Sequence, residues 1–159
     1  MSSIRSSCWA ASISAAADVA AQRMVRGKKL DIGRTARIAA FSVLTFGPQQ
    51  SYLNALGRAY PRKTMGSALA KTLANQFVFA PVNISLAFLW ELGLTGKMHR
   101  TKDKFRTDLG PMLIGGSAFW IPLTLVGFAT VPVGMQAAFF KVAGVPWKIY
   151  TAHAVTSKR

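Results

Sequence analysis

The stretch FWIPLTLVGFATVPVGMQAAFF, residues 119–140, decides the fold of this chain. It contains no charged residue, and two prolines and two glycines interrupt it. The uncharged run around it extends from Asp108 to Lys141. As one straight helix this run would measure about 48 Å at ~1.5 Å per residue, which exceeds the ~30 Å hydrocarbon core of a bilayer. A single perpendicular helix therefore fits the run poorly.

The prolines divide the run into two pieces. Proline removes a backbone hydrogen bond and bends or ends a helix. We predict that Pro122 bends a spanning helix over residues 109–131. Pro132 then separates this helix from a second helical piece over residues 133–150, which we expect to lie partly at the membrane interface.

The distribution of charge indicates a membrane protein. Twenty Lys and Arg residues stand against five Asp and Glu residues, and such an excess usually points to nucleic acid or to anionic lipid. Here the charges gather at the ends of apolar runs, with none between Arg37 and Arg58 or between Lys71 and Glu91. A nucleic-acid domain would scatter its basic residues along amphipathic faces, so we expect no nucleic-acid partner. A hydrophobic soluble core, the alternative, would have to explain three such gaps in one short chain.

The predicted fold is an all-α integral membrane bundle of four proline-kinked transmembrane helices, forming one domain over residues 1–159. The helices are expected over residues 4–22, 31–58, 67–94 and 109–131, followed by the partly interfacial segment 133–150. Asp31 is suited to begin the second helix. The expected kinks lie at Gly47, Pro48, Pro81, Pro122 and Pro132.

No catalytic constellation is visible in the sequence. His99 and His153 lie far apart with no acid close to either, and Gly115-Gly116 is not followed by the lysine and hydroxyl of a phosphate loop. Cys8 is the single cysteine, so no intramolecular disulfide or cysteine-based metal site can form. We therefore expect a protein without enzymatic activity, cofactor or metal.

Several segments together resemble a known family. These are ADVAAQ, LDIGRTARIAAFSVLTFGPQQSYLNAL, KTLANQFVFAP, FWIP, VP and PWKIY. In order and spacing they are similar to the Mpv-seventeen and twenty-two-kilodalton peroxisomal membrane protein family, over roughly residues 12–150. The resemblance implies a small four-helix protein of the inner mitochondrial or the peroxisomal membrane. The serine- and arginine-containing start is similar to a mitochondrial presequence, but we expect internal targeting signals rather than a removable one.

The resemblance also implies which polar residues matter, and where this chain departs from its family. A polar cluster matches the family pattern at Asp18, Gln22, Asp31, Arg34, Arg37 and Gln76. In the last helix the family's polar glutamine, asparagine and arginine are replaced here by Thr124, Gly127 and Gln136. Polar residues inside a bundle often mark an ion pathway or a buried network. The chain thus keeps the bends of the family and loses part of that network.

Asp18 is the one acid expected to face the bundle, and Arg34 and Arg37 are its expected partners. Two interpretations remain open. The cluster is either a clamp that joins the first two helices or the lining of a gate or pore. The clamp is favoured because this chain has lost several of the polar residues that would line a pore.

The basic connections predict binding to lipid head groups. Each Lys or Arg near an anionic surface contributes about 1 kcal/mol, and basic pockets at helix ends suit cardiolipin. Solvated charge that sets topology is the alternative. The candidate residues are Arg26, Lys28, Lys29, Arg62, Lys63, Arg100, Lys102, Lys104 and Arg106.

The sequence leaves two functional classes. The chain is predicted to be a non-enzymatic multi-pass protein of the mitochondrial inner membrane, with the peroxisomal membrane as alternative location. The favoured role is that of a structural or accessory subunit that contacts other membrane subunits and anionic lipid. The alternative, which the family resemblance suggests, is a self-contained pore or metabolite channel.

Overall fold

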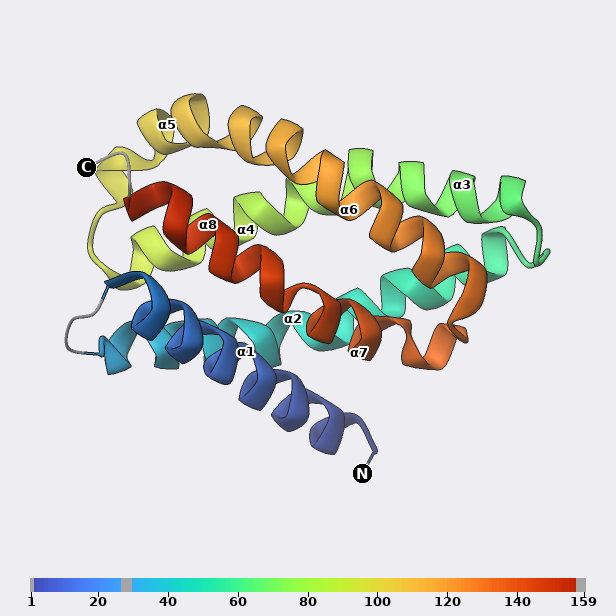
Figure 1. Cartoon of the computed structure of the whole chain (residues 1–159), viewed down its shortest axis with the longest axis horizontal. Coiled ribbons are helices and arrows are strands. Elements are labelled where there is room, and N and C mark those ends of the chain that lie inside the picture. Colours follow the sequence, from blue (N-terminus) through green and yellow to red (C-terminus); the bar gives the residue numbers. More distant parts are fainter. Residues whose placement is uncertain (1, 27–29, 157–159) are drawn as a thin grey trace. The chain divides into compact units, whose positions relative to one another are not determined.

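The computed structural model describes the backbone of residues 2–26 and 30–156, and the described residues form helices and turns without a β-strand (Figure 1). The predicted all-α fold is therefore confirmed for this part of the chain. The longer helices are α1 (Ser2–Arg26), α2 (Ile32–Ala59), α3 (Met65–Ala74), α4 (Ala80–Leu94), α6 (Gly110–Thr130), α7 (Val133–Ala143) and α8 (Val145–Thr156).

Side chains and glycine fix where several of these helices begin and end. The carboxylate of Asp31 accepts a hydrogen bond from the backbone N–H of Arg34 at 2.8 Å, so Asp31 begins α2 as predicted. Thr64 does the same for α3 by accepting from Ser67 N–H at 3.3 Å. After α4, Gly96 takes a left-handed conformation with φ +68°, and Lys97 N–H then reaches Leu92 C=O at 2.8 Å.

The predicted helix over residues 67–94 is interrupted in its middle. A π-helical turn, Asn75–Phe79, separates α3 from α4, and Pro81 follows it in the first turn of α4. In a regular α-helix the ring of Pro81 would collide with the carbonyl four residues earlier, at Phe77. The wider π turn lies where this collision would occur, so the irregularity precedes the proline.

The expected basic loop after α4 is helical instead. A 3₁₀ turn (Met98–Arg100), the short helix α5 (Thr101–Lys104) and a π turn (Phe105–Leu109) lead directly into α6. Lys104 forms an ion pair with Asp108 one turn further on, and the Thr107 hydroxyl donates to Asp103 C=O at 2.9 Å. Neighbours at this spacing support a helix. The high charge of the segment favours a loop in the sequence, whereas the four-residue spacing of Lys104 and Asp108 supports the observed helix.

Of the other three prolines that were expected to kink or break a helix, Pro132 follows a break, whereas helices continue through Pro48 and Pro122. Val131, before Pro132, is extended with φ −92° and ψ 130°, and the break between α6 and α7 lies there. Pro48 and Pro122 instead lie within α2 and α6, which continue past them. The predicted segment 133–150 is divided at Gly144 into α7 and α8, and it continues to Thr156.

The chain consists of two compact units. Unit 1 comprises Met1–Asn54 and Gly134–Arg159, and unit 2 comprises Ala55–Val133. In unit 1, α8 lies beside α1, although the two are far apart in the sequence (Figure 1). In unit 2, α3 lies beside α6.

Two helical stretches of unit 2 are long and apolar enough to cross a membrane. They are Met65–Leu94 and Met98–Thr130, and 11% and 22% of their most apolar windows are buried inside the structure. A core helix of a soluble protein would bury most of such a window. The other predicted spans, in α1 and α2, are long enough but do not combine this length with sufficient apolarity and few charges among the described residues. The four-span bundle therefore stays a prediction.

The exposed apolar surface of α6 makes membrane insertion testable by cysteine labelling. The Ile114 side chain is 78% exposed, so only lipid or a partner can shield it. We expect Ile114→Cys, made in a Cys8→Ser background, to react much more slowly with a water-soluble maleimide in sealed membranes than after denaturation. Lys102→Cys, at an exposed position of α5, is the control. It is labelled in membranes opened so that the reagent reaches both faces, and there it should react rapidly. Equal labelling of both cysteines in opened membranes would contradict insertion of α6.

Candidate functional site

The carboxylate of Asp18 is the centre of a buried polar network in unit 1. The residue is 3% exposed and lies on α1. Its Oδ1 lies 3.1 Å from the Nε of Arg34 on α2. Its Oδ2 accepts hydrogen bonds from the Gln22 amide at 2.7 Å and from the Thr35 hydroxyl at 2.7 Å. Both oxygens of a buried charge are thus engaged, which is the condition for tolerating its burial.

Gln22 connects this carboxylate to the start of α2. Its Nε2 also lies 3.0 Å from the Thr35 hydroxyl oxygen, and its Oε1 accepts the backbone N–H of Asp31 at 2.7 Å. Because the N–H groups at the beginning of a helix have no partner within that helix, Gln22 and the Asp31 side chain together complete the start of α2. The network therefore fixes how α1 and α2 meet.

The structure brings together most of the predicted cluster. Asp18, Gln22, Asp31 and Arg34 are joined as predicted, and Arg34 is the observed partner of Asp18. Arg37 is half-buried one turn along α2, where its guanidinium lies beside Gly33.

Gln76 belongs to a different contact, within unit 2. Its amide donates to the Ser117 hydroxyl of α6 at 2.8 Å, and the Ser117 hydroxyl donates in turn to Leu113 C=O at 2.7 Å. Gln76 is 8% exposed. This pair joins the π turn after α3 to α6, so the predicted cluster is divided between the two units.

Several members of these networks were missed by the sequence analysis. They are Thr35, Ser117 and a further pair in unit 1, in which the Ser42 hydroxyl of α2 donates to the Ser14 hydroxyl of α1 at 2.7 Å. All four are hydroxyl residues, which fit apolar helices without special explanation. One signal was available in α1, where Ser14, Asp18 and Gln22 recur at four-residue spacing and therefore share one helix face. The partners on other helices carry no comparable pattern.

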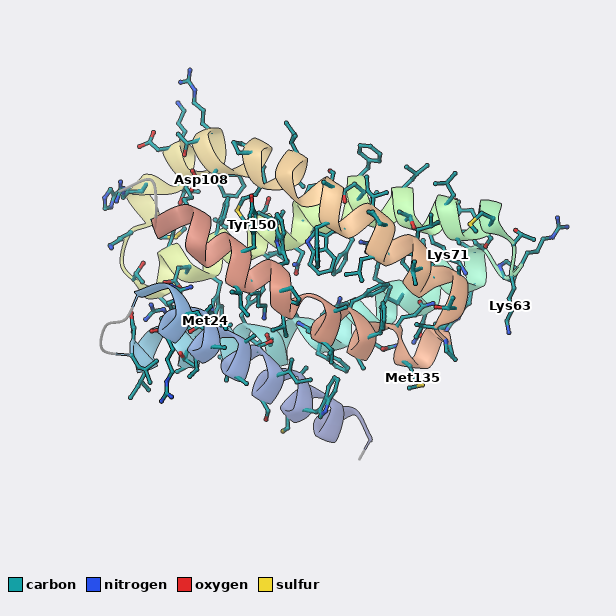
Figure 2. The ribbon with its side chains drawn as sticks, viewed as in Figure 1. Met24, Lys63, Lys71, Asp108, Met135 and Tyr150 are labelled. Atoms are coloured by element: carbon teal, nitrogen blue, oxygen red, sulfur yellow. The ribbon has the colours of Figure 1, made fainter. Side chains whose placement is uncertain are left out.

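The candidate head-group residues lie mainly at the helix connections. Arg62 and Lys63 are exposed in the turn between α2 and α3, and Figure 2 shows Lys63 pointing away from the helices. Arg100, Lys102 and Arg106 are exposed around α5. Lys104 is half-buried, pairs with Asp108 and lies 5.1 Å from the ring centroid of Phe88. Lys28, Lys29 and the side chain of Arg26 lie outside the described part of the structure.

These arrangements describe an α-helical protein with exposed apolar helices and internally bonded polar groups, as expected of a membrane protein. The model of the Mpv17 / PMP22 family matches residues 93–152. This match and the relatives described next support membership of this family, as the sequence resemblance implied.

Relatives extend the match over most of the chain. An uncharacterized protein of Schizosaccharomyces pombe is 30% identical over 77% of this chain and 56% of its own length. Protein sym-1 of Neurospora crassa is 28% identical over 84% of this chain and 80% of its own length. An Mpv17-like protein of Bos taurus is 28% identical over 82% and 67%. The chain spans little more than half of the Schizosaccharomyces pombe relative, and no solved structure matches significantly.

Removing the charge of Asp18 tests whether the network is a clamp. Asp18→Asn keeps the shape but deprives Arg34 of its anion, so we expect a loss of about 1–3 kcal/mol in stability. The measurement is the thermal midpoint of the detergent-purified chain, together with its abundance in membranes. Asp103→Asn, at an exposed position, is the control. If Asp18→Asn instead leaves both readouts unchanged and alters ion leak across the membrane, the clamp interpretation is wrong.

The Gln76–Ser117 contact is suited to a double-mutant cycle. Ser117→Ala leaves the buried amide of Gln76 without its hydroxyl partner, and we expect a loss of about 1 kcal/mol or more. Gln76→Leu combined with Ser117→Ala should cost less than the sum of the single changes, because neither then leaves a polar group stranded. Thermal unfolding of the three variants and of the unchanged chain gives the coupling free energy between the two side chains. If the stability losses of the single variants simply add up in the double variant, the two side chains do not interact.

Proposed function

We propose that this chain is a non-enzymatic, multi-pass protein of the mitochondrial inner membrane that serves as a structural or accessory subunit of a larger complex. Membership of the Mpv17/PMP22 family supports a mitochondrial or peroxisomal membrane. The relatives from fungi named SYM1 and sym-1 favour the mitochondrion. In this proposal α1, α2, the α3–α4 stretch and the α5–α6 stretch cross the bilayer, with α7 and α8 partly at its interface.

One observation favours a structural role over that of a channel. The buried carboxylate of Asp18 has its hydrogen bonds within the protein, to Gln22, Arg34 and Thr35. A residue lining an aqueous path would keep part of its hydrogen bonding for water or for the passing solute. The Gln76–Ser117 pair is likewise internal. These polar groups are occupied in holding helices together.

The exposed apolar face of unit 2 supports contact with lipid or neighbouring subunits. Large apolar side chains with more than a third of their surface exposed follow one another along α3, the π turn Asn75–Phe79 and α4. They are Met65, Leu69, Leu73, Phe77, Val78, Val82, Leu86 and Leu89. Contiguous apolar surface of this kind marks membrane or protein contact.

The basic residues supplement this face at its ends. Arg62 and Lys63 in one connection and Arg100, Lys102 and Arg106 around α5 are exposed. We propose that they contact anionic head groups such as those of cardiolipin.

Native electrophoresis of mitochondria solubilised in mild detergent separates the two functional classes. With the chain followed by mass spectrometry, an accessory subunit migrates with a complex many times its mass of 17.2 kDa. If the chain migrates alone or as a small oligomer at every detergent concentration, the accessory role is contradicted. The self-contained channel is then the better hypothesis. A known subunit of another inner-membrane complex, followed in the same gel, controls for dissociation by detergent.

A further inference from the structure

The N-terminal end of α3 in unit 2 is open and carries a partial positive charge. α3 begins after Thr64, whose hydroxyl accepts the N–H of Ser67. The N–H groups of Met65 and Gly66, at the first two positions of the helix, have no partner within it. Both residues are exposed, and nothing lies within 4 Å of the place where a side chain at Gly66 would begin. The helix thus presents two free donors and its positive end to open space.

The turn before α3 adds two cations to this end. Arg62 and Lys63 are exposed in it. The turn is tied to α3, because the Ser67 hydroxyl donates to Tyr60 C=O at 3.1 Å and the Thr64 hydroxyl caps the helix. The two cations are therefore held next to the free N–H groups.

A third cation, Lys71, is covered by the protein but has no counterion. The residue is 8% exposed. Among the described residues its ammonium makes no hydrogen bond and no ion pair, and a covered charge without a partner is costly. The Lys71 nitrogen is not fully enclosed, whereas the hydroxyl oxygen of the neighbouring Thr72 is. A ligand can therefore reach the ammonium.

The direction of Lys71 leads back to the N-terminal end of α3. Side chains of an α-helix lean toward its N-terminus. Lys71 follows Ser67 by four residues and Thr64 by seven, so the three lie in one row along the helix. Lys71 lies about 9 Å beyond Met65 at ~1.5 Å per residue, and its long side chain covers part of this length. Figure 2 shows Lys71 on the inner side of α3, at the end of unit 2 that also carries Lys63.

The three acids of unit 2, all within the described residues, lie away from this end. They are Glu91, Asp103 and Asp108. Glu91 follows Lys71 by twenty residues, which is about 30 Å along the helices. Asp103 and Asp108 belong to the segment beyond α4, and Asp108 is already paired with Lys104. The positive charge at the start of α3 therefore has to be balanced by a group that does not belong to unit 2.

We propose that the N-terminal end of α3 binds a phosphate group, held by the N–H groups of Met65 and Gly66 and by the ammonium of Lys71. Phosphate suits this arrangement because its several oxygens accept hydrogen bonds from the start of a helix and from ammonium groups together. Arg62 and Lys63 add charge at the open side. The site includes these two residues, so it rests on the head-group contact proposed for them above.

The phosphate has two sources with the same chemistry, a free phosphate compound and the head group of a phospholipid. Binding is measured on the full purified chain as the shift of its thermal midpoint. In the first arm, inorganic phosphate is titrated in dodecyl maltoside, against sodium chloride at equal ionic strength. In the second arm, the chain is placed in phosphatidylcholine nanodiscs with and without cardiolipin.

We expect a saturable upward shift in at least one arm. A shift with inorganic phosphate identifies a free phosphate compound as sufficient. A shift with cardiolipin alone identifies the lipid head group.

Two variants connect the shift to the proposed site. Lys71→Met removes the charge and keeps an apolar side chain of similar length, so the apparent affinity should fall by about tenfold or more. Met65→Pro removes a free N–H without breaking a helical bond, because proline is favoured at this first position. Thr64, with φ −116° and ψ 157°, already has the conformation that a following proline requires.

Met65→Pro should therefore weaken binding without lowering the thermal midpoint of the free chain, which keeps the test valid if Lys71→Met does not fold. Lys97→Met is the control. It lies at an exposed position after α4, changes the net charge by the same amount as Lys71→Met and should retain the affinity.

Three results would overturn the proposal. The first is the absence of a saturable shift in both arms. The second is an equal loss of affinity in Lys97→Met and in the folded site variants, which would indicate a general effect of charge. The third is a shift that persists in both site variants and is lost in Lys102→Gln. Head groups would then bind around α5 and not at α3, while native electrophoresis still decides separately whether the chain is an accessory subunit.

Discussion

The burial of the Asp18 carboxylate is the constraint on which unit 1 depends. An ionised carboxylate removed from water costs several kcal/mol unless charge and hydrogen bonds compensate for it. The compensation comes from Gln22 in the same helix and from Arg34 and Thr35 in the next. Their positions require α1 and the start of α2 to meet in one register. In this way the carboxylate specifies the helix arrangement more than it stabilises it.

Unit 2 meets a different constraint, the missing backbone bonds of its prolines. In an apolar environment a freed carbonyl needs a partner or a local change of helix geometry. The π turn before Pro81 is such a change. Beside it, Gln76 donates to Ser117 of α6, so a side-chain bond joins the helices where the backbone is irregular. In both units, therefore, polar side chains bond two helices together: at the start of α2 in unit 1 and at the π turn before Pro81 in unit 2.

The sequence predicted the helical class, the capping role of Asp31 and the pairing of Asp18 with Arg34. These features follow from local pattern and charge, which sequence shows directly. It did not predict the π turn at Asn75–Phe79 or the helical turns of Met98–Leu109. The first depends on how the chain absorbs a steric conflict, and the second on spacing within a charged segment. Thr35 and Ser42 were missed because a hydroxyl residue gains meaning only from the helix that packs against it.

We infer that the buried polar groups hold helices together and do not line a water path. Release of a small fluorescent dye from liposomes that contain the purified chain tests this inference, with protein-free liposomes as the blank. We expect release at the rate of the blank. Release that rises with the amount of protein and changes with Asp18→Asn would contradict it.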